Sequence, residues 1–270
     1  TYTILGERTR DYDKYDEFGI SNPSGLMYAK IGELTKYRFN LGLKPVLRIN
    51  KNLTLSSMFD YSVDKTVEDR FLPMKYSAPV MVPDKGISYN EINSQVMRNT
   101  SFFDETRLTY DKKIDNMSNL KATYGFRFIS NYYESDYAEV HNSGSNNNTT
   151  ISASYQYLTV DGINNKTKSL SNYLNVDYSF DNKYFVNGVV SMDASSRFGR
   201  ETEGGIQLLG ASWGIFPAIN GAWLISSEPF MKNVDFVNFA KLRAGYGLTG
   251  NDGISDYESM AYFSSVRWYD

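Results

Sequence analysis

The side chains that could carry catalytic or metal chemistry are few in this sequence. The 270 residues include no cysteine, which excludes a disulfide framework, a thiolate metal site and a thiol nucleophile. The one histidine, His141, lies in a stretch rich in Asn, Ser and Gly at residues 140–150. Because no second histidine is present to build a site around it, we expect His141 to be a solvated loop residue.

The acidic residues and glycines do not form a recognisable catalytic arrangement either. The acidic clusters lie in polar stretches where solvated charge is the default, at Asp11, Asp13, Asp16, Glu17, Glu201 and Glu203. The spacing of Gly204-Gly205 and of residues 250–253 matches neither common phosphate-binding loop. The sequence therefore predicts that the protein is not an enzyme, with no catalytic residue, no metal and no cofactor.

Composition narrows the remaining classes. A net charge of -3 without a basic cluster argues against nucleic acid as a partner. Aromatic residues make up 15% of the chain, with 22 tyrosines, which favours strands over helices. Mean hydropathy is -0.45 and no apolar stretch reaches the roughly 18 to 20 residues of a membrane helix, but a membrane β-barrel escapes that test. Residues 1–4 do not start a signal peptide, although a mature or truncated chain would have lost one.

The segments that must position any site alternate between apolar and polar residues, with a period of two. Between Lys36 and Lys44 the odd positions are apolar and the even positions are polar or small, which predicts a strand with two unlike faces. This strand continues to Ile49, and after a turn at 50–52 a second strand follows at 53–62. About nine such segments occur, the others including 102–110, 120–128, 170–180, 184–193 and 240–248.

The lengths of the connections alternate along the chain. Short turns are predicted at 50–52, 112–118, 181–183 and 226–238, and long polar connections at 63–100, 135–168, 198–206 and 249–258. Outer-membrane barrels have this arrangement, with short periplasmic turns and longer extracellular loops. The segment Ile151 to Thr159 would break the alternation as a membrane strand, so we interpret it as part of a tall extracellular loop.

A soluble antiparallel sandwich is the alternative that shows the same alternation. Segments 36–49, 118–132 and 184–197 exceed the usual length of soluble strands and reach the roughly 9 to 11 residues needed to cross a bilayer. The polar face also carries many charges, at Lys36, Arg38, Lys121, Arg127, Lys241 and Arg243. Nine spans cannot close a bacterial barrel with an even strand number. We therefore predict an all-β, antiparallel transmembrane β-barrel, present here as an incomplete middle section of a larger barrel.

Four sequence blocks after Ser169 occur in a characteristic order. They are Tyr178–Tyr184; Asp193–Gly199, a "DGSSRFG" block with Ala194 in place of glycine; Phe216-Pro217-Ala218 followed by Ala222-Trp223 and Glu228-Pro229-Phe230-Met231; and Leu242–Asn251, similar to "LKLRASYGxTGN". In this order the blocks resemble the SusC/RagA family of TonB-dependent outer-membrane transporters. The resemblance covers about a third of the chain.

The resemblance implies a barrel of about 22 strands with an N-terminal plug. Residues 1–270 would then form part of the barrel domain, without the plug and without the C-terminal end of the barrel. It further implies the outer membrane of a Gram-negative bacterium of the Bacteroidetes type. The implied partners are a SusD-like surface lipoprotein, the TonB complex through segments outside this chain, the lipid bilayer, and a glycan or oligopeptide substrate.

The motif residues are expected to have structural roles rather than to bind a ligand. Gly245, Gly247 and Gly250 suit a bend or a close backbone approach, and Ser226 or Ser227 suits the cap of a short helical turn at Pro229. Asp193 and Arg197 are spaced to bridge charges on one strand face. The full set is Asp193, Ser195, Ser196, Arg197, Phe198, Gly199, Pro217, Trp223, Glu228, Phe230, Leu242, Arg243, Tyr246, Gly247, Gly250 and Asn251.

Residues that bind the substrate stay unassigned. A group of tyrosines near the tall loop could stack on sugar rings, but a membrane-interface girdle or packing of the loop on itself is the favoured interpretation, for Tyr132, Tyr133, Tyr137, Tyr155 and Tyr157. The leading functional hypothesis is energised nutrient import. The alternatives are a passive porin or structural barrel, and a soluble sugar-binding β-sandwich.

Overall fold

The computed structural model describes residues 20–21, 23–198, 205–232, 234 and 236–254. Its helical content is one short helix, α1 (Pro23–Ala29), and two 3-10 turns, η1 (Ile225–Ser227) and η2 (Pro229–Met231). In these ranges no helix is both long and apolar enough to cross a membrane. Strands make up almost all the remaining regular structure.

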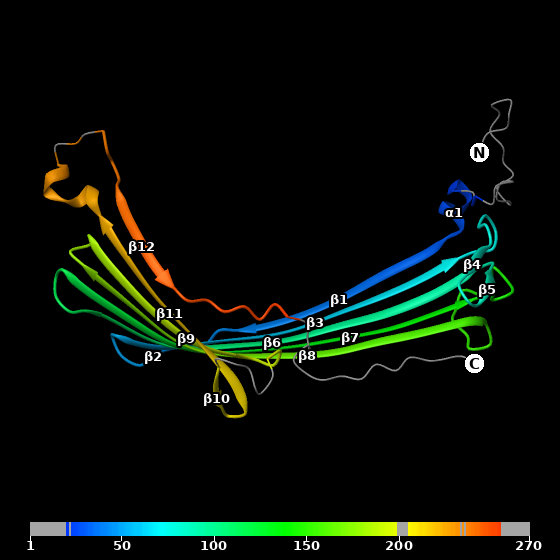
Figure 1. Ribbon diagram of the computed structural model, residues 1–270, viewed down its shortest axis with the longest axis horizontal. Helices are drawn as coiled ribbons and strands as arrows, with labels where there is room; N and C mark the ends of the chain where they lie inside the picture. The colour runs from blue at the N-terminus through cyan, green and yellow to red at the C-terminus, as the bar shows by residue number, and fades with distance from the viewer. Residues whose placement is uncertain (1–19, 22, 199–204, 233, 235, 255–270) are drawn as a thin grey trace. The chain divides into compact units, whose positions relative to one another are not determined.

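Twelve strands occur in the described part of the chain, and most of them join one antiparallel sheet (Figure 1). The sheet order is β1-β3-β6-β7-β8-β9-β11-β10, with β2 paired to β3 and β12 paired to β11, while β4 and β5 form a separate pair. The all-β, antiparallel fold predicted from the alternation is confirmed, and the sheet is open. The strands are β1 (Ile31–Leu43), β2 (Val46–Arg48), β3 (Leu53–Leu72), β4 (Val80–Val82), β5 (Gly86–Ser88), β6 (Glu91–Lys113), β7 (Ser118–His141), β8 (Gln156–Phe180), β9 (Tyr184–Ser195), β10 (Ile206–Leu208), β11 (Ala211–Leu224) and β12 (Lys241–Gly247).

The chain divides into two compact units. The first unit comprises residues 1–39, 63–100 and 132–165, and includes α1, β4 and β5. The second unit comprises residues 40–62, 101–131 and 166–270, and includes β9, β11 and β12. The four sequence blocks all lie in the second unit.

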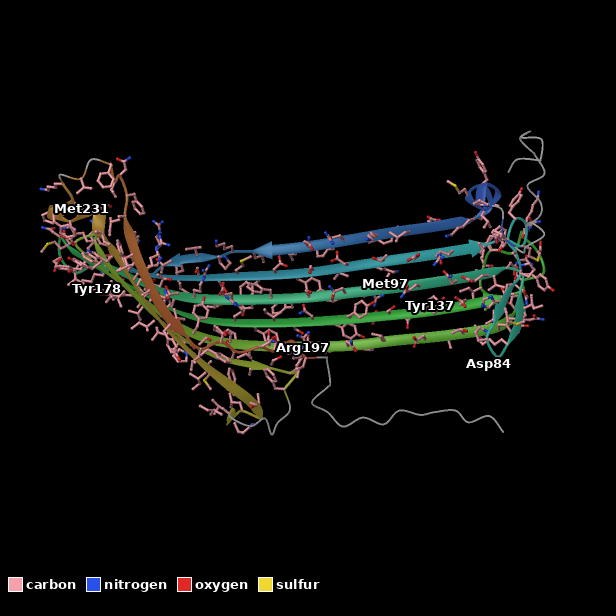
Figure 2. All side chains as sticks on the ribbon, turned by 45° about the horizontal axis from the view of Figure 1, so that its top comes forward. Asp84, Met97, Tyr137, Tyr178, Arg197 and Met231 are labelled. Atoms are coloured by element: carbon pink, nitrogen blue, oxygen red, sulfur yellow. The ribbon has the colours of Figure 1, made fainter. Side chains whose placement is uncertain are left out.

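Side chains project alternately from the two faces of the strands (Figure 2). In the second unit, the register pairs Leu174 with Val190 and Tyr178 with Val186 on one face, and Asp177 with Asn187 on the other. The apolar face is largely exposed. Only six hydrophobic side chains are buried among the described residues, which is too few for the core of a soluble sandwich: Phe71, Ala78, Ile92, Val140, Ala194 and Trp213.

Four strands extend further than the alternation predicts. The connections expected at 63–100 and 135–168 are partly strand, because β3 continues to Leu72, β6 begins at Glu91, β7 continues to His141 and β8 begins at Gln156. Their added residues are polar at positions of both faces, for example Asp64 to Thr66, so no alternation marks them. The segment interpreted as loop at 151–159 is divided, since residues 156–159 belong to β8.

The prediction for His141 is wrong. This side chain is 4% exposed and ends β7 in the first unit. Its Nδ1 lies 2.8 Å from Ser88 Oγ and its Nε2 lies 3.0 Å from Glu139 Oε1. Asn90 Nδ2 donates to Ser143 Oγ at 2.7 Å beside it. The polar residues around His141 satisfy each other, so the segment folds back instead of being solvated.

Short turns close the hairpins of the second unit by side-chain hydrogen bonds. Asn50 Oδ1 accepts from the backbone N–H of Leu53 at 2.9 Å, and Asp115 Oδ1 accepts from the N–H of Ser118 at 2.7 Å. The backbone hydrogen bonds from Met117 and Ser118 lower the pKa of Asp115. Asp181 and Asn182 have φ values of 51° and 52°, as a two-residue turn of the hairpin type requires.

Candidate functional site

Residues of two of the four sequence blocks meet on the polar face of the second unit. A hollow of about 760 Å³, which we call the motif groove, is lined by Phe216 of β11 and by two segments, residues 193–195 with Phe198, and residues 248–252. Arg197 Nη1 donates to the backbone oxygen of Asp252 at 3.3 Å and lies 3.8 Å from its Oδ2. Folding thus joins residues that are 55 positions apart in the chain.

Glycines allow this close approach. A Cβ atom at Gly250 or at Gly214 would contact the ring of Phe216, and one at Gly247 would lie 2.8 Å from the Cβ of Ala218. A Cβ at Gly245 would meet the amide oxygen of Asn220. These contacts are consistent with the expected close approach at Gly245, Gly247 and Gly250.

The serines of the second block, Asp193–Gly199, form local hydrogen bonds at the groove. Asp193 accepts from Ser171 Oγ and from Ser191 Oγ, the latter at 2.7 Å. Ser196 Oγ accepts from the N–H of Lys168 at 2.8 Å, and Ser195 Oγ accepts from the N–H of Arg197 at 3.3 Å. Asp193 and Arg197, which were expected to bridge charges, therefore have other partners. Gly199 lies outside the described residues.

A charged network lies beside the groove on β6, β7 and β8. Glu105 Oε1 accepts from Arg127 Nη2 at 2.8 Å and from the hydroxyl of Tyr173 at 2.9 Å, and Arg107 Nε lies 3.8 Å from Oε2. Glu105 is 8% exposed. Gly125 leaves room for the Tyr173 ring, which a Cβ would contact. Sequence analysis missed Glu105 and Tyr173, although Arg127 was among the charges expected on the polar face.

Residues of the first and third blocks form what we call the rim cluster: Lys183, Tyr184, Trp223, Glu228 and Phe230. Glu228 Oε1 accepts from the hydroxyl of Tyr184 at 2.6 Å and from Trp223 Nε1 at 2.9 Å, while Lys183 Nζ lies 3.8 Å from Oε2. Trp223 stacks on Tyr184 at a ring separation of 6.4 Å and meets Phe230 edge-on. These hydrogen bonds, first that from Tyr184, lower the pKa of Glu228.

The predicted cap of the helical turn is wrong. Pro229 opens η2 as expected, but the N-cap position is Glu228, and no side-chain hydrogen bond caps either 3-10 turn. The reason is that Ser226 and Ser227 are themselves part of η1, so they cannot occupy the cap of η2.

The other motif residues are placed by the strand register. Leu242 pairs with Trp223 and Tyr246 with Ile219, on the apolar face of β11 and β12. The carbonyl oxygen of Pro217 accepts from the N–H of Leu248 at 2.9 Å. Asn251 Oδ1 accepts from the N–H of Gly253 at 2.8 Å.

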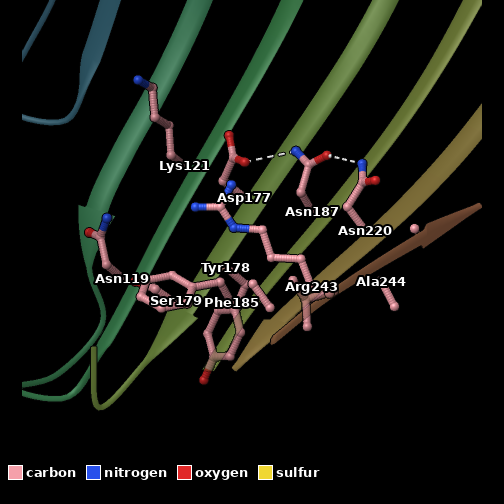
Figure 3. Close-up of a pocket in the computed structure, with 14 residues that line it drawn as sticks. Asn119, Lys121, Asp177, Tyr178, Ser179, Phe185, Asn187, Asn220, Arg243 and Ala244 are labelled. Carbon is pink, nitrogen blue, oxygen red and sulfur yellow. Dashed lines mark hydrogen bonds between the residues drawn. The ribbon is translucent and has the colours of Figure 1, made fainter. Parts of the chain in front are cut away.

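A chain of side-chain amides crosses the polar face of β8, β9 and β11 (Figure 3). Asn220 Nδ2 donates to Asn187 Oδ1 at 3.0 Å, and Asn187 Nδ2 donates to Asn175 Oδ1 at 2.6 Å and to Asp177 Oδ1 at 2.7 Å. We call Asn175, Asp177, Asn187 and Asn220 the amide ladder. It borders a hollow of about 580 Å³, the ladder hollow, which Lys121 and Arg243 also line.

The tyrosines near the tall loop contact protein atoms of the first unit. Tyr155 packs against the small core of Phe71, Ile92 and Val140, and the Tyr157 ring lies 6.0 Å from that of His141. Tyr132 donates to Glu134 at 2.9 Å, and Tyr137 donates to Glu139. These contacts support the interpretation that the loop packs on itself. No group of three potential metal ligands occurs in the described ranges.

Comparison with known proteins identifies relatives of the chain, although no family model matches it. TonB-dependent receptor P39 of Formosa agariphila is 33% identical over 190 residues, which cover 68% of this chain and 17% of that protein. TonB-dependent receptor P3 of the same organism is 25% identical over 92% of this chain and 23% of its own length. TonB-dependent receptor SusC of Bacteroides thetaiotaomicron is 35% identical over 81 residues, 30% of this chain and 7% of SusC.

Solved structures show the same fold. The RagAB peptide transporter matches with a TM-score of 0.73 at 17% identity, over 93% of this chain and 27% of that chain. The RagAB importer in its open-open state matches with a TM-score of 0.74 at 18% identity, over 94% and 27%. The chain thus spans about a quarter or less of the length of these relatives. With the four ordered blocks and the shared fold, it belongs to the SusC/RagA family of TonB-dependent receptors and forms a section of their β-barrel.

Proposed function

We propose that this chain forms part of the wall of an outer-membrane importer that is energised through TonB. The observation that carries the proposal is the pairing of one exposed apolar face with one hydrogen-bonded polar face on the same strands of the second unit. Such a sheet suits a wall between lipid and a water-filled passage. The energy coupling is proposed because the relatives include TonB-dependent receptors.

Strand lengths support the membrane crossing. β9 has 12 residues and β11 has 14, enough for the roughly 9 to 11 that cross a bilayer at a tilt. The short turns near Asn50, Asp115 and Asp181 close hairpins of the second unit and suit the periplasmic side. The outer membrane of a Gram-negative bacterium of the Bacteroidetes type is the proposed location.

The partners and cargo follow from the relatives. RagAB is described as a peptide importer, and SusC is a TonB-dependent receptor. We propose a SusD-like surface lipoprotein as partner, and a glycan or an oligopeptide as cargo. Contact with TonB would use segments outside this chain, and the role is transport rather than catalysis.

Uptake by whole cells tests the energy coupling. Cells with and without the full-length gene would receive fluorescent oligopeptide and oligosaccharide pools, with or without a protonophore that collapses the proton gradient. We expect gene-dependent uptake that the protonophore abolishes. Gene-dependent uptake that survives the protonophore would instead establish a passive porin.

Isolation from native membranes tests the assembly. The full-length protein, extracted in detergent, should co-purify with a surface lipoprotein and should have a mass several times the 30.8 kDa of this chain. A stable species of 30.8 kDa that needs no detergent would contradict both the barrel and the import function.

A further inference from the structure

The ladder hollow on the polar face of the second unit contains an unbalanced set of charges. Lys121 of β7 and Arg243 of β12 line it with one carboxylate, that of Asp177 on β8. The lining therefore carries one net positive charge. Such an excess inside a concave surface attracts anions.

The one carboxylate is already hydrogen-bonded within the protein. Asp177 Oδ1 accepts from Asn187 at 2.7 Å, and Oδ2 accepts from Asn175 at 2.7 Å. Asn187 uses its amide nitrogen for two bonds, and its oxygen accepts from Asn220. Both carboxylate oxygens of Asp177 thus have partners within the amide ladder, and these hydrogen bonds do not require a ligand.

The two cations, unlike Asp177, have no such partners among the described residues. Across the described part of the chain, neither Lys121 nor Arg243 forms an ion pair or a side-chain hydrogen bond. Lys241, two residues before Arg243, lies over the ring of Phe185 at 4.2 Å. In Figure 3 the Arg243 side chain points across the strands toward the side of the hollow where Asp177 and Lys121 lie.

We propose that Arg243, with Lys121 on the far side, binds a carboxylate-bearing ligand in the ladder hollow. A guanidinium stays charged and presents a planar fork that matches a carboxylate. β7 and β12 are four strand spacings apart, about 19 Å at the backbone, and the Arg243 side chain reaches across part of that width (Figure 3).

The ligand carboxylate has two possible sources: acidic cargo, or an acidic segment of the same polypeptide outside residues 1–270. The assignment rests on the proposed function in one respect, that the polar face lines the passage. Binding to purified protein does not depend on transport, however. A failed uptake experiment and a failed binding experiment are therefore separate results.

Calorimetry on the full-length protein in detergent provides the first test, with acetylated tetraglutamate as probe and acetylated tetraglutamine as neutral control. We expect tetraglutamate to bind and Arg243→Gln to weaken binding about tenfold, as for the loss of a charge-assisted pair. Arg48→Gln, an exposed arginine on β2 outside the hollow, should leave the affinity unchanged. If tetraglutamate binds the natural protein and Arg243→Gln with equal affinity, the proposal is overturned.

Asp177→Asn separates ligand binding from a simple pairing of Arg243 with Asp177. If Arg243 binds the ligand, removal of the competing charge should preserve or tighten tetraglutamate binding. If Asp177→Asn loses binding as Arg243→Gln does, the hollow depends on Asp177 itself and the assignment is wrong.

Arginine-selective labelling with phenylglyoxal, read by peptide mass spectrometry, distinguishes the two sources of the ligand carboxylate. Arg243 that reacts freely and is protected by tetraglutamate indicates acidic cargo. An internal segment would give three results together. Arg243 would be protected without the probe, the protein would not bind tetraglutamate, and Arg243→Gln would destabilise it. Labelling of Arg243 at the rate of Arg48 under all conditions would contradict both.

Discussion

At the scale of single residues, the rim cluster shows how one carboxylate can organise a turn. Glu228 receives hydrogen bonds from Tyr184 and Trp223 on two neighbouring strands, and Lys183 lies nearby. The stacked rings of Tyr184 and Trp223 cover apolar surface beside it. Three of the five members were motif residues, yet only the fold reveals that the five side chains form one cluster.

We predict that Glu228→Gln lowers the thermal unfolding midpoint of the full-length protein in detergent by a few degrees. The neutral amide accepts weaker hydrogen bonds from Tyr184 and Trp223 than the carboxylate does. Circular dichroism would measure the midpoint. Trp223→Phe is the companion variant, because it keeps an aromatic ring beside Tyr184 and removes the indole donor. If both variants melt with the natural protein, the cluster has no role in stability.

The same carboxylate predicts a pH dependence. The pKa of Glu228 in the fold is below its ordinary value of 4.5, so its charge stabilises the folded protein above that pH. This contribution is lost as the pH falls through the lowered pKa. The difference in midpoint between the natural protein and Glu228→Gln should therefore be constant above pH 4.5 and shrink below it. A difference that grows toward acid pH would contradict this sign.

At the scale of elements, glycines let the segment that follows β12 lie close to β11. The ring of Phe216 on β11 occupies the space where Gly250 and Gly214 have no side chain. We predict that Gly250→Ala destabilises the protein by about 1 to 3 kcal/mol through overpacking. Denaturant unfolding of the full-length protein would measure the change.

A control for this substitution lies on the same sheet. A Cβ at Gly221 of β11 would have no atom within 4 Å, so Gly221→Ala should be close to neutral. Phe216→Val should restore much of the stability of Gly250→Ala, because a smaller side chain relieves the contact. A Gly250→Ala protein that Phe216→Val destabilises further would show that the contact is not the cause.

Strand existence was predictable, but strand length was not. Alternation at 170–180 and 184–193 identified β8 and β9 because one face of these segments is apolar and the other polar. The same rule failed at 63–72 and 91–100, where polar residues occupy both faces and only backbone pairing defines the strand. Periodicity reports the environment of side chains and not the hydrogen bonds of the backbone.

The candidate site was predictable only in its parts. The motif blocks identified Trp223, Glu228 and Phe230, and the turn chemistry identified Gly250. Their partners depend on contacts between distant segments, such as the bond from Tyr184 to Glu228 across 44 residues. The prediction for His141 was wrong for the same reason, since its contact Ser88 is 53 residues away in the chain.

At the scale of the whole molecule, the two faces of the sheet predict a labelling pattern. The chain has no cysteine, so single cysteines can be placed without altering a native thiol in this section. In the full-length protein, reconstituted in vesicles after removal of any cysteine elsewhere, Asn187→Cys and Ser191→Cys should react with a water-soluble maleimide. Val186→Cys and Val190→Cys should react far more slowly, because the register places them on the apolar face. Equal rates at all four positions would contradict a wall between lipid and water.

The period of two also limits how such a protein can change over evolutionary time. A one-residue deletion within β9 would move every later side chain of that strand to the opposite face, so lipid would meet Asn187 and Asp193. Insertions and deletions in the strands should therefore survive mainly in pairs, while the long connections tolerate changes in length. New cargo preferences would then arise from loop remodelling and from replacements at alternate strand positions, in lineages whose strand phase stays the same.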